Sequence, residues 1–229
     1  PVSEIYGLSE TCGPLTWSPN EMRIGFVGEP IPGETVALGE DGEVLVKGGN
    51  VFGGYFRDEE KTREAIDADG WFHTGDIGQF VDGQLRIVDR KKELIITAGG
   101  KNVSPANLEA HLKSCPYIGH ACVVGEGKKY LGVLIAPEAE NAAFWAMMAG
   151  LGEDESTLSA LAQNPNFIAE IQKGVDAANE HVSSAESIRK FVILDHEWLP
   201  DSDVLTPTMK LKRRVVVAKY ADEINSMFE

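Results

Sequence analysis

The sequence has 229 residues, of which 43% are hydrophobic and 25% charged, and its formal net charge at pH 7 is −15. This composition is ordinary for a soluble globular protein and excludes a disordered, collagen-like or coiled-coil chain. So large a negative charge disfavours binding to nucleic acids and anionic membranes, because their phosphates repel it. Three cysteines without metal-ligand spacing, and no apolar run of roughly 20 residues, predict a cytoplasmic protein without a transmembrane segment.

The first part of the chain, residues 1–88, has the pattern of a β structure. Alternating apolar and polar residues at 43–47 and 84–88 predict two half-buried strands, each preceded by an Asp-Gly turn. Residues 58–66 predict a short helix with exposed charges between them. We therefore expect residues 1–88 to form a mostly antiparallel β subdomain.

The second part, residues 89–229, alternates predicted strands and helices. Ser104 followed by Pro105 is a strong helix start, with a capping hydroxyl and a proline at the first helical position. Short apolar runs predict strands near 94–97, 121–124, 133–136 and 191–194, and helical spacing predicts helices over 138–149, 154–163, 165–182 and 213–227. The predicted fold class of the whole chain is α+β.

Two segments of the first part are richer in functional side chains than a packed element needs. Residues 6–11 (YGLSET) offer an aromatic ring, a hydroxyl and a carboxylate, which suit a base, a phosphate oxygen and a magnesium ion. Residues 70–76 (GWFHTGD) place an acid after a Thr-Gly turn, where it can accept two bonds from a ribose diol. On chemistry alone, ordinary turns are the favoured interpretation of both segments.

Two further segments follow in the second part. Residues 89–105 (DRKKELIITAGGKNVSP) contain an arginine that can bind hydroxyls or phosphate and two glycines that permit close backbone approach. Residues 206–214 (TPTMKLKRR) are the only dense basic cluster, and one of its lysines could reach a phosphate. A solvated hairpin end and a solvated helix start are the alternatives. The five histidines lack the spacing of a zinc site.

Taken in order, the four segments resemble the motifs of the adenylate-forming enzymes, the family of acyl-CoA synthetases, luciferases and peptide-synthetase adenylation domains. YGLSET resembles the family's Tyr-Gly-x-Thr-Glu motif and GWFHTGD its Trp-x-x-Thr-Gly-Asp motif, while the third and fourth segments resemble its hinge with glycine loop and its C-terminal lysine motif. The resemblance covers essentially the whole chain. The sequences of the segments GGKNVSPANLE and TPTMKLKRR most resemble those of the long-chain fatty acyl-CoA synthetase branch.

The resemblance implies a domain organisation. Residues 1–88 would be the last, β-rich subdomain of a large and here incomplete N-terminal adenylation domain. Residues 89–229 would be a small, mobile α+β lid domain that turns about a hinge at Asp89. The family's phosphate loop, ending in Pro-Lys-Gly, is absent from the sequence. We therefore expect a C-terminal portion that needs the missing N-terminal part of the same chain and is inactive alone. Any peripheral contact with a membrane is expected to come from the missing parts.

The resemblance also implies an activity, that of an ATP-dependent long-chain fatty acid–CoA ligase of lipid metabolism. Such an enzyme converts a fatty acid, ATP and CoA into acyl-CoA, AMP and pyrophosphate through acyl-AMP, with Mg2+ as the metal ion. The residues that would bind ATP or AMP are Tyr6 and Gly7 at the adenine, Ser9 at a phosphate, and Asp76 and Arg90 at the ribose. Glu10 would hold the magnesium ion.

Two residues of the second part have implied roles in the two steps. Lys210 would be the catalytic residue of adenylation, bridging the substrate carboxylate and the phosphate, with Lys212 as the alternative. Gly100 would let the pantetheine arm of CoA pass, with Gly99 as the alternative because the stretch before Gly100 is one residue longer than in several relatives. Two other functions remain open: an enzyme that adenylates a different carboxylic or amino acid, and a noncatalytic module that binds a nucleotide or a partner.

Overall fold

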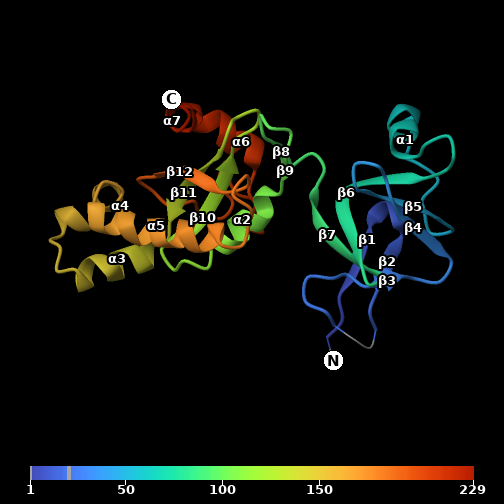
Figure 1. Cartoon of the computed structure of the whole chain (residues 1–229), viewed down its shortest axis with the longest axis horizontal. Coiled ribbons are helices and arrows are strands. Elements are labelled where there is room, and N and C mark those ends of the chain that lie inside the picture. Colours follow the sequence, from blue (N-terminus) through green and yellow to red (C-terminus); the bar gives the residue numbers. More distant parts are fainter. Residues whose placement is uncertain (1, 20–21) are drawn as a thin grey trace. The chain divides into compact units, whose positions relative to one another are not determined.

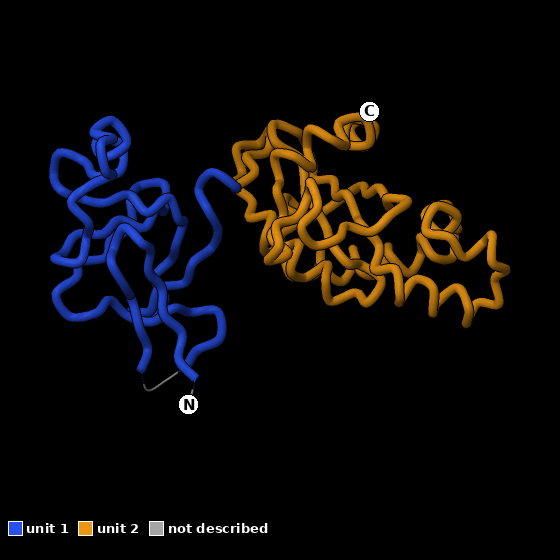
Figure 2. The backbone as a smooth tube through the Cα atoms, turned by 180° about the vertical axis from the view of Figure 1, so that it is seen from behind, with its two compact units in different colours: residues 1–93 blue, residues 94–229 orange. Residues whose placement is uncertain are grey.

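The computed structural model describes residues 2–19 and 22–229, which fold into two compact units (Figures 1 and 2). Unit 1 comprises residues 1–93 and unit 2 residues 94–229. Antiparallel sheets dominate unit 1, and strands and helices are mixed in unit 2, so the predicted α+β class is confirmed. In the structure, unit 1 ends after residue 93, four residues beyond the hinge at Asp89 that the sequence suggests. Unit 1 extends this far because Arg90 still pairs with Asp76 in the larger sheet.

Unit 1 contains two antiparallel sheets. The smaller one has the strands β1 (Ile5–Leu8), β2 (Gly13–Trp17) and β3 (Glu29–Pro30), with the short 3-10 helix η1 (Ser9–Thr11) between the first two. The larger one has the order β4 (Glu34–Leu38), β5 (Glu43–Gly48), β6 (Phe72–Val81) and β7 (Gln84–Arg90). Helix α1 (Glu59–Ala65) begins where expected, because the side chain of Asp58 accepts from the Lys61 amide.

The core of unit 1 is small. Its buried apolar residues come from both sheets and are Leu15, Val44, Val46, Phe72 and Leu85. Burying one such side chain stabilises a fold by roughly 1.5–3 kcal/mol, so five of them give only a modest core. Partly buried apolar side chains, among them Phe52, Ile66 and Ile87, pack against these residues and extend the core.

Unit 2 is organised around a three-stranded sheet with the order β10 (Ile118–Val124), β11 (Leu131–Pro137) and β12 (Ile188–Ile193). The first two strands are antiparallel, and β12 runs parallel to β11. A two-stranded sheet, β8 (Ile95–Ile96) and β9 (Asn102–Val103), precedes it. The helical elements are α2 (Pro105–Leu112), α3 (Ala139–Met148), η2 (Asp154–Ser156), α4 (Leu158–Leu161), α5 (Pro165–Asn179), α6 (Arg213–Lys219) and α7 (Ala221–Ser226).

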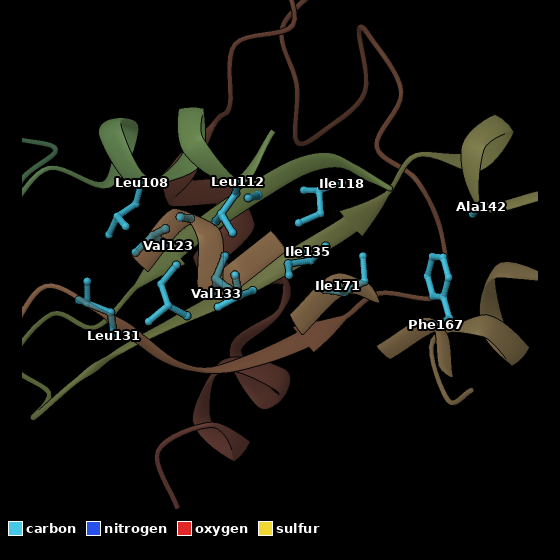
Figure 3. Packing of buried hydrophobic residues seen from close by; sticks show 14 of the residues in the cluster. Leu108, Leu112, Ile118, Val123, Leu131, Val133, Ile135, Ala142, Phe167 and Ile171 are labelled. Carbon is cyan, nitrogen blue, oxygen red and sulfur yellow. The ribbon is translucent and has the colours of Figure 1, made fainter. Parts of the chain in front are cut away.

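Both faces of the main sheet are covered, which explains why all of β11 is buried. Alternate residues of β10 and β11 point to opposite sides. Val123 and Val133 belong to an apolar layer shared with Leu108 of α2 and Ile171 of α5 (Figure 3), whereas Leu134 packs in a second layer with α6 and α7. None of the helices in the described part of the chain is long and apolar enough to cross a membrane.

Two predicted helices are interrupted. The expected helix over 154–163 is a 3-10 turn followed by the short α4, with Thr157 as the helix cap between them. The expected last helix over 213–227 is two helices, because the backbone of Tyr220 leaves helical geometry (φ −108°, ψ 35°). Tyr220 is buried, and its hydroxyl accepts from the indole N–H of Trp198. A long-range contact, invisible to helical periodicity, accompanies this interruption.

Candidate nucleotide site and lysine hairpin

Unit 1 contains a pocket of about 1040 Å³ that brings the first two sequence segments together. Its lining includes Gly7, Ser9 and Glu10 from the first segment and Thr74 and Gly75 from the second. Arg90, from the third segment, lines the same pocket. Four predicted site residues therefore share one cavity with the turn that precedes Asp76.

Asp76 is a buried carboxylate, only 3% exposed, and both of its oxygens have partners. The hydroxyl of Tyr6 donates to Oδ2 over 2.6 Å, and Arg90 Nε forms an ion pair with Oδ1 at 2.8 Å. The pairing of β6 with β7 sets Asp76 directly opposite Arg90, which explains the ion pair. Each carboxylate oxygen has two acceptor lone pairs, so this arrangement still leaves capacity for ligand hydroxyls.

Tyr6 acts here as a hydrogen-bond donor. Burial, together with the hydrogen bond to Asp76, raises the pKa of the Tyr6 hydroxyl well above its usual range. The phenol therefore stays protonated over the physiological pH range and keeps donating to the carboxylate. The structure thus places Tyr6, Asp76 and Arg90 in one cluster, and their roles toward a nucleotide stay predictions.

Gly7 has a structural reason to be glycine. A Cβ atom at this position would lie 2.2 Å from the carbonyl oxygen of Gly13 on the neighbouring strand. Ser9 is exposed and lies on η1 beside the pocket. Close packing of β1 on β2 is therefore sufficient to explain the glycine, whatever else passes near it.

Glu10 also lines the pocket, and its Oε1 accepts from the hydroxyl of Tyr55 over 3.0 Å. Burial and the nearby Glu10 raise the pKa of that phenol, which keeps it a donor. No group of three or more His, Cys, Asp or Glu side chains that could hold a metal ion occurs among residues 2–19 and 22–229. A cation at Glu10 would have to draw most of its oxygen ligands from elsewhere.

A second buried acid, Glu43, supports the turn before Asp76 and was not identified from the sequence. It is the first residue of β5 and is 5% exposed. Its Oε1 accepts from the Gly75 amide over 3.0 Å, and its Oε2 contacts Lys91 Nζ at 2.9 Å and His73 Nδ1 at 3.1 Å. The Lys91 amide in turn donates to the Gly75 carbonyl over 2.8 Å. The Gly75 residue is thus held at both its N–H and its C=O.

The charges of this cluster stabilise one another. Burial opposes the charged form of Glu43, but hydrogen bonds from Lys91, His73 and the Gly75 amide outweigh it and lower its pKa. The hydrogen bond to Glu43 raises the pKa of His73. Lys91 also forms an ion pair with Asp41 at 2.6 Å, and its bonds to Asp41 and Glu43 raise its pKa. The alternation of the predicted strand places Glu43 on the face opposite Val44 and Val46, so nothing in the sequence indicates that it is buried.

In unit 2, Gly100 lies in a tight turn between β8 and β9. Its amide donates to the Thr97 carbonyl over 2.8 Å, and its φ of +76° is one that glycine adopts readily. The space beside its Cα is open, since a Cβ atom there would meet nothing within 4 Å. Turn geometry alone requires a glycine here, and the exposed backbone leaves room for a ligand.

Lys210 lies in a short hairpin, residues 205–211, which we call the lysine hairpin. The Thr206 amide donates to the Lys210 carbonyl over 2.9 Å, and the Lys210 amide donates to Thr206 Oγ1 over 3.0 Å. Among the described residues, the Lys210 ammonium has no hydrogen-bond or ion-pair partner, whereas Lys212 Nζ donates to the Ser202 carbonyl over 2.9 Å. The geometry therefore favours Lys210 over Lys212 as the lysine available to a ligand.

Asp89 lies within β7, where it pairs with Ile77. Its side chain accepts from the Arg90 amide over 2.7 Å. A rotation about the Asp89 backbone would open the end of the β6–β7 pair. A rotation within residues 92–94 would leave that pair intact, because these residues follow Arg90, the last residue of β7. The hinge role of Asp89 stays a prediction.

Comparison with known proteins places these features in a family. A family described as the AMP-binding enzyme C-terminal domain matches residues 92–229. The long-chain-fatty-acid–CoA ligase FadD15 of Mycobacterium tuberculosis is 48% identical over 229 residues, which cover 99% of this chain and 38% of that relative. The chain thus spans little more than a third of the length of this curated relative.

Solved structures share the fold. The o-succinylbenzoate CoA synthetase (MenE) of Bacillus subtilis, in complex with the acyl-adenylate intermediate OSB-AMP, matches with a TM-score of 0.68 and 27% identity, covering 93% of this chain and 40% of that one. The adenylation domain of a carboxylate reductase from Mycobacterium chelonae matches with a TM-score of 0.72 and 21% identity, covering 99% and 34%. The second likeness concerns the fold alone.

Proposed function

This chain belongs to the AMP-binding enzyme C-terminal domain family, and on that premise we propose that it is the C-terminal part of a long-chain fatty acid–CoA ligase. The reaction would join a fatty acid to CoA at the expense of ATP, through acyl-AMP. The similarity to a long-chain ligase along 99% of the chain supports the substrate class. Within the structure, the proposal rests on the buried Asp76 carboxylate, held by Tyr6 and Arg90 beside a pocket of about 1040 Å³ that Thr74, Gly75 and Arg90 line.

In the first step, unit 1 would hold the nucleotide. Asp76 would accept hydrogen bonds from the ribose hydroxyls through its remaining lone pairs, with Arg90 paired to Oδ1 beside it. Tyr6 and Gly7 would lie along the adenine, and the Ser9 hydroxyl would donate to a phosphate oxygen. Because Glu43 and Lys91 fix both sides of Gly75, Asp76 would need little rearrangement on binding, which lowers the entropic cost of association.

Glu10 is the residue that would hold Mg2+. A magnesium ion commonly uses one or two carboxylates and takes its other ligands from water and substrate phosphates. A single carboxylate at the pocket wall fits that pattern once ATP is present. When bound, the ion supplies neutralisation of the phosphate charge.

Lys210 would solve the electrostatic problem of adenylation. A fatty carboxylate must approach the α-phosphorus of ATP, and two anions repel each other unless positive charge lies between them. The Lys210 ammonium, which has no partner among the described residues, is free to bridge both groups. The lysine hairpin holds the Lys210 backbone, so its side chain would be presented from a fixed base.

The second step would use the glycine turn. The thiol of CoA would attack the acyl-AMP carbonyl carbon, forming the thioester and releasing AMP. The open space at Gly100 would let the pantetheine arm pass without a side chain in its way. Asp89 is the proposed pivot for the change between the two steps, with residues 92–94 as the alternative that leaves β7 intact.

A second candidate function is adenylation of another acid. The similarity to a synthetase that carries OSB-AMP supports it, since that enzyme is a CoA synthetase for a different carboxylate. A noncatalytic nucleotide-binding module is the third. It would have no use for the Lys210 ammonium, which has no partner within the described part of the chain.

The test is acyl-CoA formation by the full-length protein that carries this chain. Palmitate, acetate and an aromatic acid are each supplied with ATP, Mg2+ and CoA, and acyl-CoA is quantified. We expect turnover of palmitate at least about 10-fold above the others, a difference of 1.4 kcal/mol in transition-state binding. Turnover of another acid alone would replace the long-chain assignment, and no turnover with any acid would favour the noncatalytic module. The 229-residue chain alone, run in parallel, is expected to form no acyl-CoA.

A further inference from the structure

The main sheet of unit 2 has an open edge at β10. The strand order is β10-β11-β12, so one side of β10 has no neighbouring strand among residues 2–19 and 22–229. A strand edge that is not paired with another strand is usually covered or flanked by charged side chains. If the edge is buried, its N–H and C=O groups need other hydrogen-bond partners, because unpaired buried backbone groups cost free energy. Val123, near the end of this strand, is 1% exposed. Its backbone groups therefore need partners that are not strand residues.

Two side chains supply those partners. The Val123 amide donates to Glu109 Oε1 over 2.8 Å, and the Val123 carbonyl accepts from Arg213 Nη1 over 3.0 Å. Arg213 Nη2 donates to Glu109 Oε1 and Oε2 over 2.8 and 2.9 Å. The ion pair thus takes the place of a neighbouring strand. We call the group Glu109, Arg213 and Val123 the edge clamp.

The edge clamp is a closed and largely buried arrangement. The side chains of Arg213 and Glu109 are only 17% and 12% exposed. Most ion pairs between exposed side chains contribute little to stability, but a hydrogen-bonded pair shielded from water holds its geometry much more firmly. The orientation of the Arg213 guanidinium is also fixed, because its planar group donates to the Glu109 carboxylate and to the Val123 carbonyl at the same time.

Arg213 is three residues from Lys210 and is the first residue of α6. Between them, Leu211 pairs with Leu205, and the Lys212 amide donates to the Val204 carbonyl over 2.8 Å. These contacts close the lysine hairpin on itself, and the buried Leu205 and the partly buried Leu211 pack it into the second apolar layer of the sheet. The clamp joins the end of the hairpin to α2 and β10.

We propose that Glu109 and Arg213 are positioning residues for Lys210, which hold the lysine hairpin at a fixed place on the sheet edge. The inference rests on the proposed catalytic role of Lys210. Neither side chain would touch the substrate. Their effect would be to keep the Lys210 backbone where its ammonium reaches the reacting groups, and a displacement of about 1 Å from a distant change can cost on the order of 100-fold in rate.

The test has two arms, both on the full-length protein. In the first, hydrogen exchange is measured in the peptide spanning residues 204–212 and, as an internal reference, in residues 131–137 of β11. In the second, the two half-reactions are separated: acyl-AMP formation from palmitate and ATP, and acyl-CoA formation from supplied acyl-AMP and CoA. The variants are Arg213→Met, Glu109→Gln and Arg213→Lys. The last retains the positive charge but loses the planar guanidinium that donates to two groups at once.

A matched control lies on the same helix. Lys219 forms an ion pair with Asp203 at 2.8 Å, but both side chains are about half exposed. Lys219→Met removes that pair without touching the edge clamp. It should leave the exchange of residues 204–212 and both half-reactions unchanged within about twofold, as expected for an exposed pair.

For Arg213→Met and Glu109→Gln we expect exchange in residues 204–212 to rise at least 10-fold while that of β11 stays constant. Acyl-AMP formation should fall by about 10- to 100-fold, with acyl-CoA formation from supplied acyl-AMP within about threefold of the parent, and Arg213→Lys should be intermediate. Unchanged exchange in the hairpin would overturn the inference, as would an equal fall of both half-reactions. If Arg213→Met does not fold, Glu109→Gln and Arg213→Lys decide the question.

The failure of the proposed function would look different. If Lys210→Ala left acyl-AMP formation intact, the role of Lys210 would be wrong, whatever the edge clamp does. If Lys210→Ala abolished acyl-AMP formation while the clamp variants loosened the hairpin without slowing that step, the positioning role would be wrong and the catalytic role would stand.

Discussion

Unit 1 and unit 2 carry their candidate functional groups in opposite ways. In unit 1 the two central acids are buried: Asp76 and Glu43 are 3% and 5% exposed, and both are held by other polar side chains. In unit 2 the groups lie at the surface: Lys210 and Gly100 are exposed on turns above two apolar layers. Unit 1 thus holds two acids inside the fold through polar partners, whereas unit 2 presents Lys210 and Gly100 at its surface.

This difference predicts how each unit responds to change. A buried polar site costs stability unless every partner is present, so in unit 1 the site and the fold should fail together. In unit 2 the apolar layers bear the stability, so the turns can change with little effect on folding. Each prediction below perturbs one unit and uses the other as the reference.

The largest effect is expected from the core of unit 2. Ile171 is fully buried on α5, and Ile171→Ala should destabilise unit 2 by about 3 kcal/mol, the usual cost of an Ile-to-Ala cavity. Exchange of the slowest amides in β11 reports unit 2, and that in β6 reports unit 1, which should not change. Phe144→Ala, at a side chain that is 59% exposed, is the control and should cost less than about 0.5 kcal/mol. Equal destabilisation of both units would contradict the comparison.

The next effect is expected from the buried acid of unit 1. Glu43→Gln removes the charge that pairs with Lys91 and His73, and it should destabilise unit 1 by about 2 kcal/mol. Nucleotide affinity should fall with it, because the Gly75 amide loses its charged acceptor. The control is Asp82→Asn, which breaks the exposed pair with Arg23. Should Glu43→Gln lower affinity without lowering the stability of unit 1, site and fold would be separable there.

A smaller effect, of opposite sign in the two units, is expected from pH. The hydrogen bond to Glu43 raises the pKa of His73 above its ordinary 6.5, so its contribution to unit 1 is complete below pH 6.5 and is lost as pH rises through the raised pKa. Burial lowers the pKa of His111 and His120 in unit 2 below 6.5. Their contribution is complete above pH 6.5 and is lost as pH falls through the lowered pKa.

Urea unfolding followed by exchange at pH 5.5, 7.0 and 8.5 tests this. Unit 1 should be less stable at 8.5 than at 7.0, and unit 2 less stable at 5.5 than at 7.0, each by less than about 1 kcal/mol because these groups are partly solvated. The Glu43 pKa is lowered, so its charge is constant over this range. His73→Gln should remove the loss in unit 1 at high pH. A loss of the same sign in both units would show that other groups dominate.

The same division decided what could be predicted from the sequence. Local signals were reliable: Ser104 caps α2 through the Asn107 amide with Pro105 next in the chain, and Asp58 caps α1. The segments containing Tyr6, Asp76 and Arg90 were chosen for their chemistry, and the structure brings these residues together. Helix caps and motifs can be predicted from the sequence because they depend on residues that are neighbours in the chain.

Contacts between distant residues could not be predicted. Glu43 is 30 residues from His73 and 48 from Lys91, and Glu109 is 104 residues from Arg213. No periodicity or spacing links such pairs, because the fold alone brings them together. The interruption at Tyr220 has the same origin, since that side chain bonds to Trp198 from a separate segment. Residues that support a site are thus harder to find from sequence than residues that form it.

The most direct test of the account compares Lys210→Ala and Asp76→Asn in the full-length protein. Acyl-AMP formation from palmitate and ATP is measured beside acyl-CoA formation from supplied acyl-AMP, together with the affinity for AMP. We predict that Lys210→Ala lowers acyl-AMP formation at least about 100-fold, as the loss of a transition-state charge contact does, while AMP affinity and the second step are retained. Asp76→Asn should instead weaken AMP binding. Full acyl-AMP formation by Lys210→Ala would contradict the assignment of adenylation to the lysine hairpin.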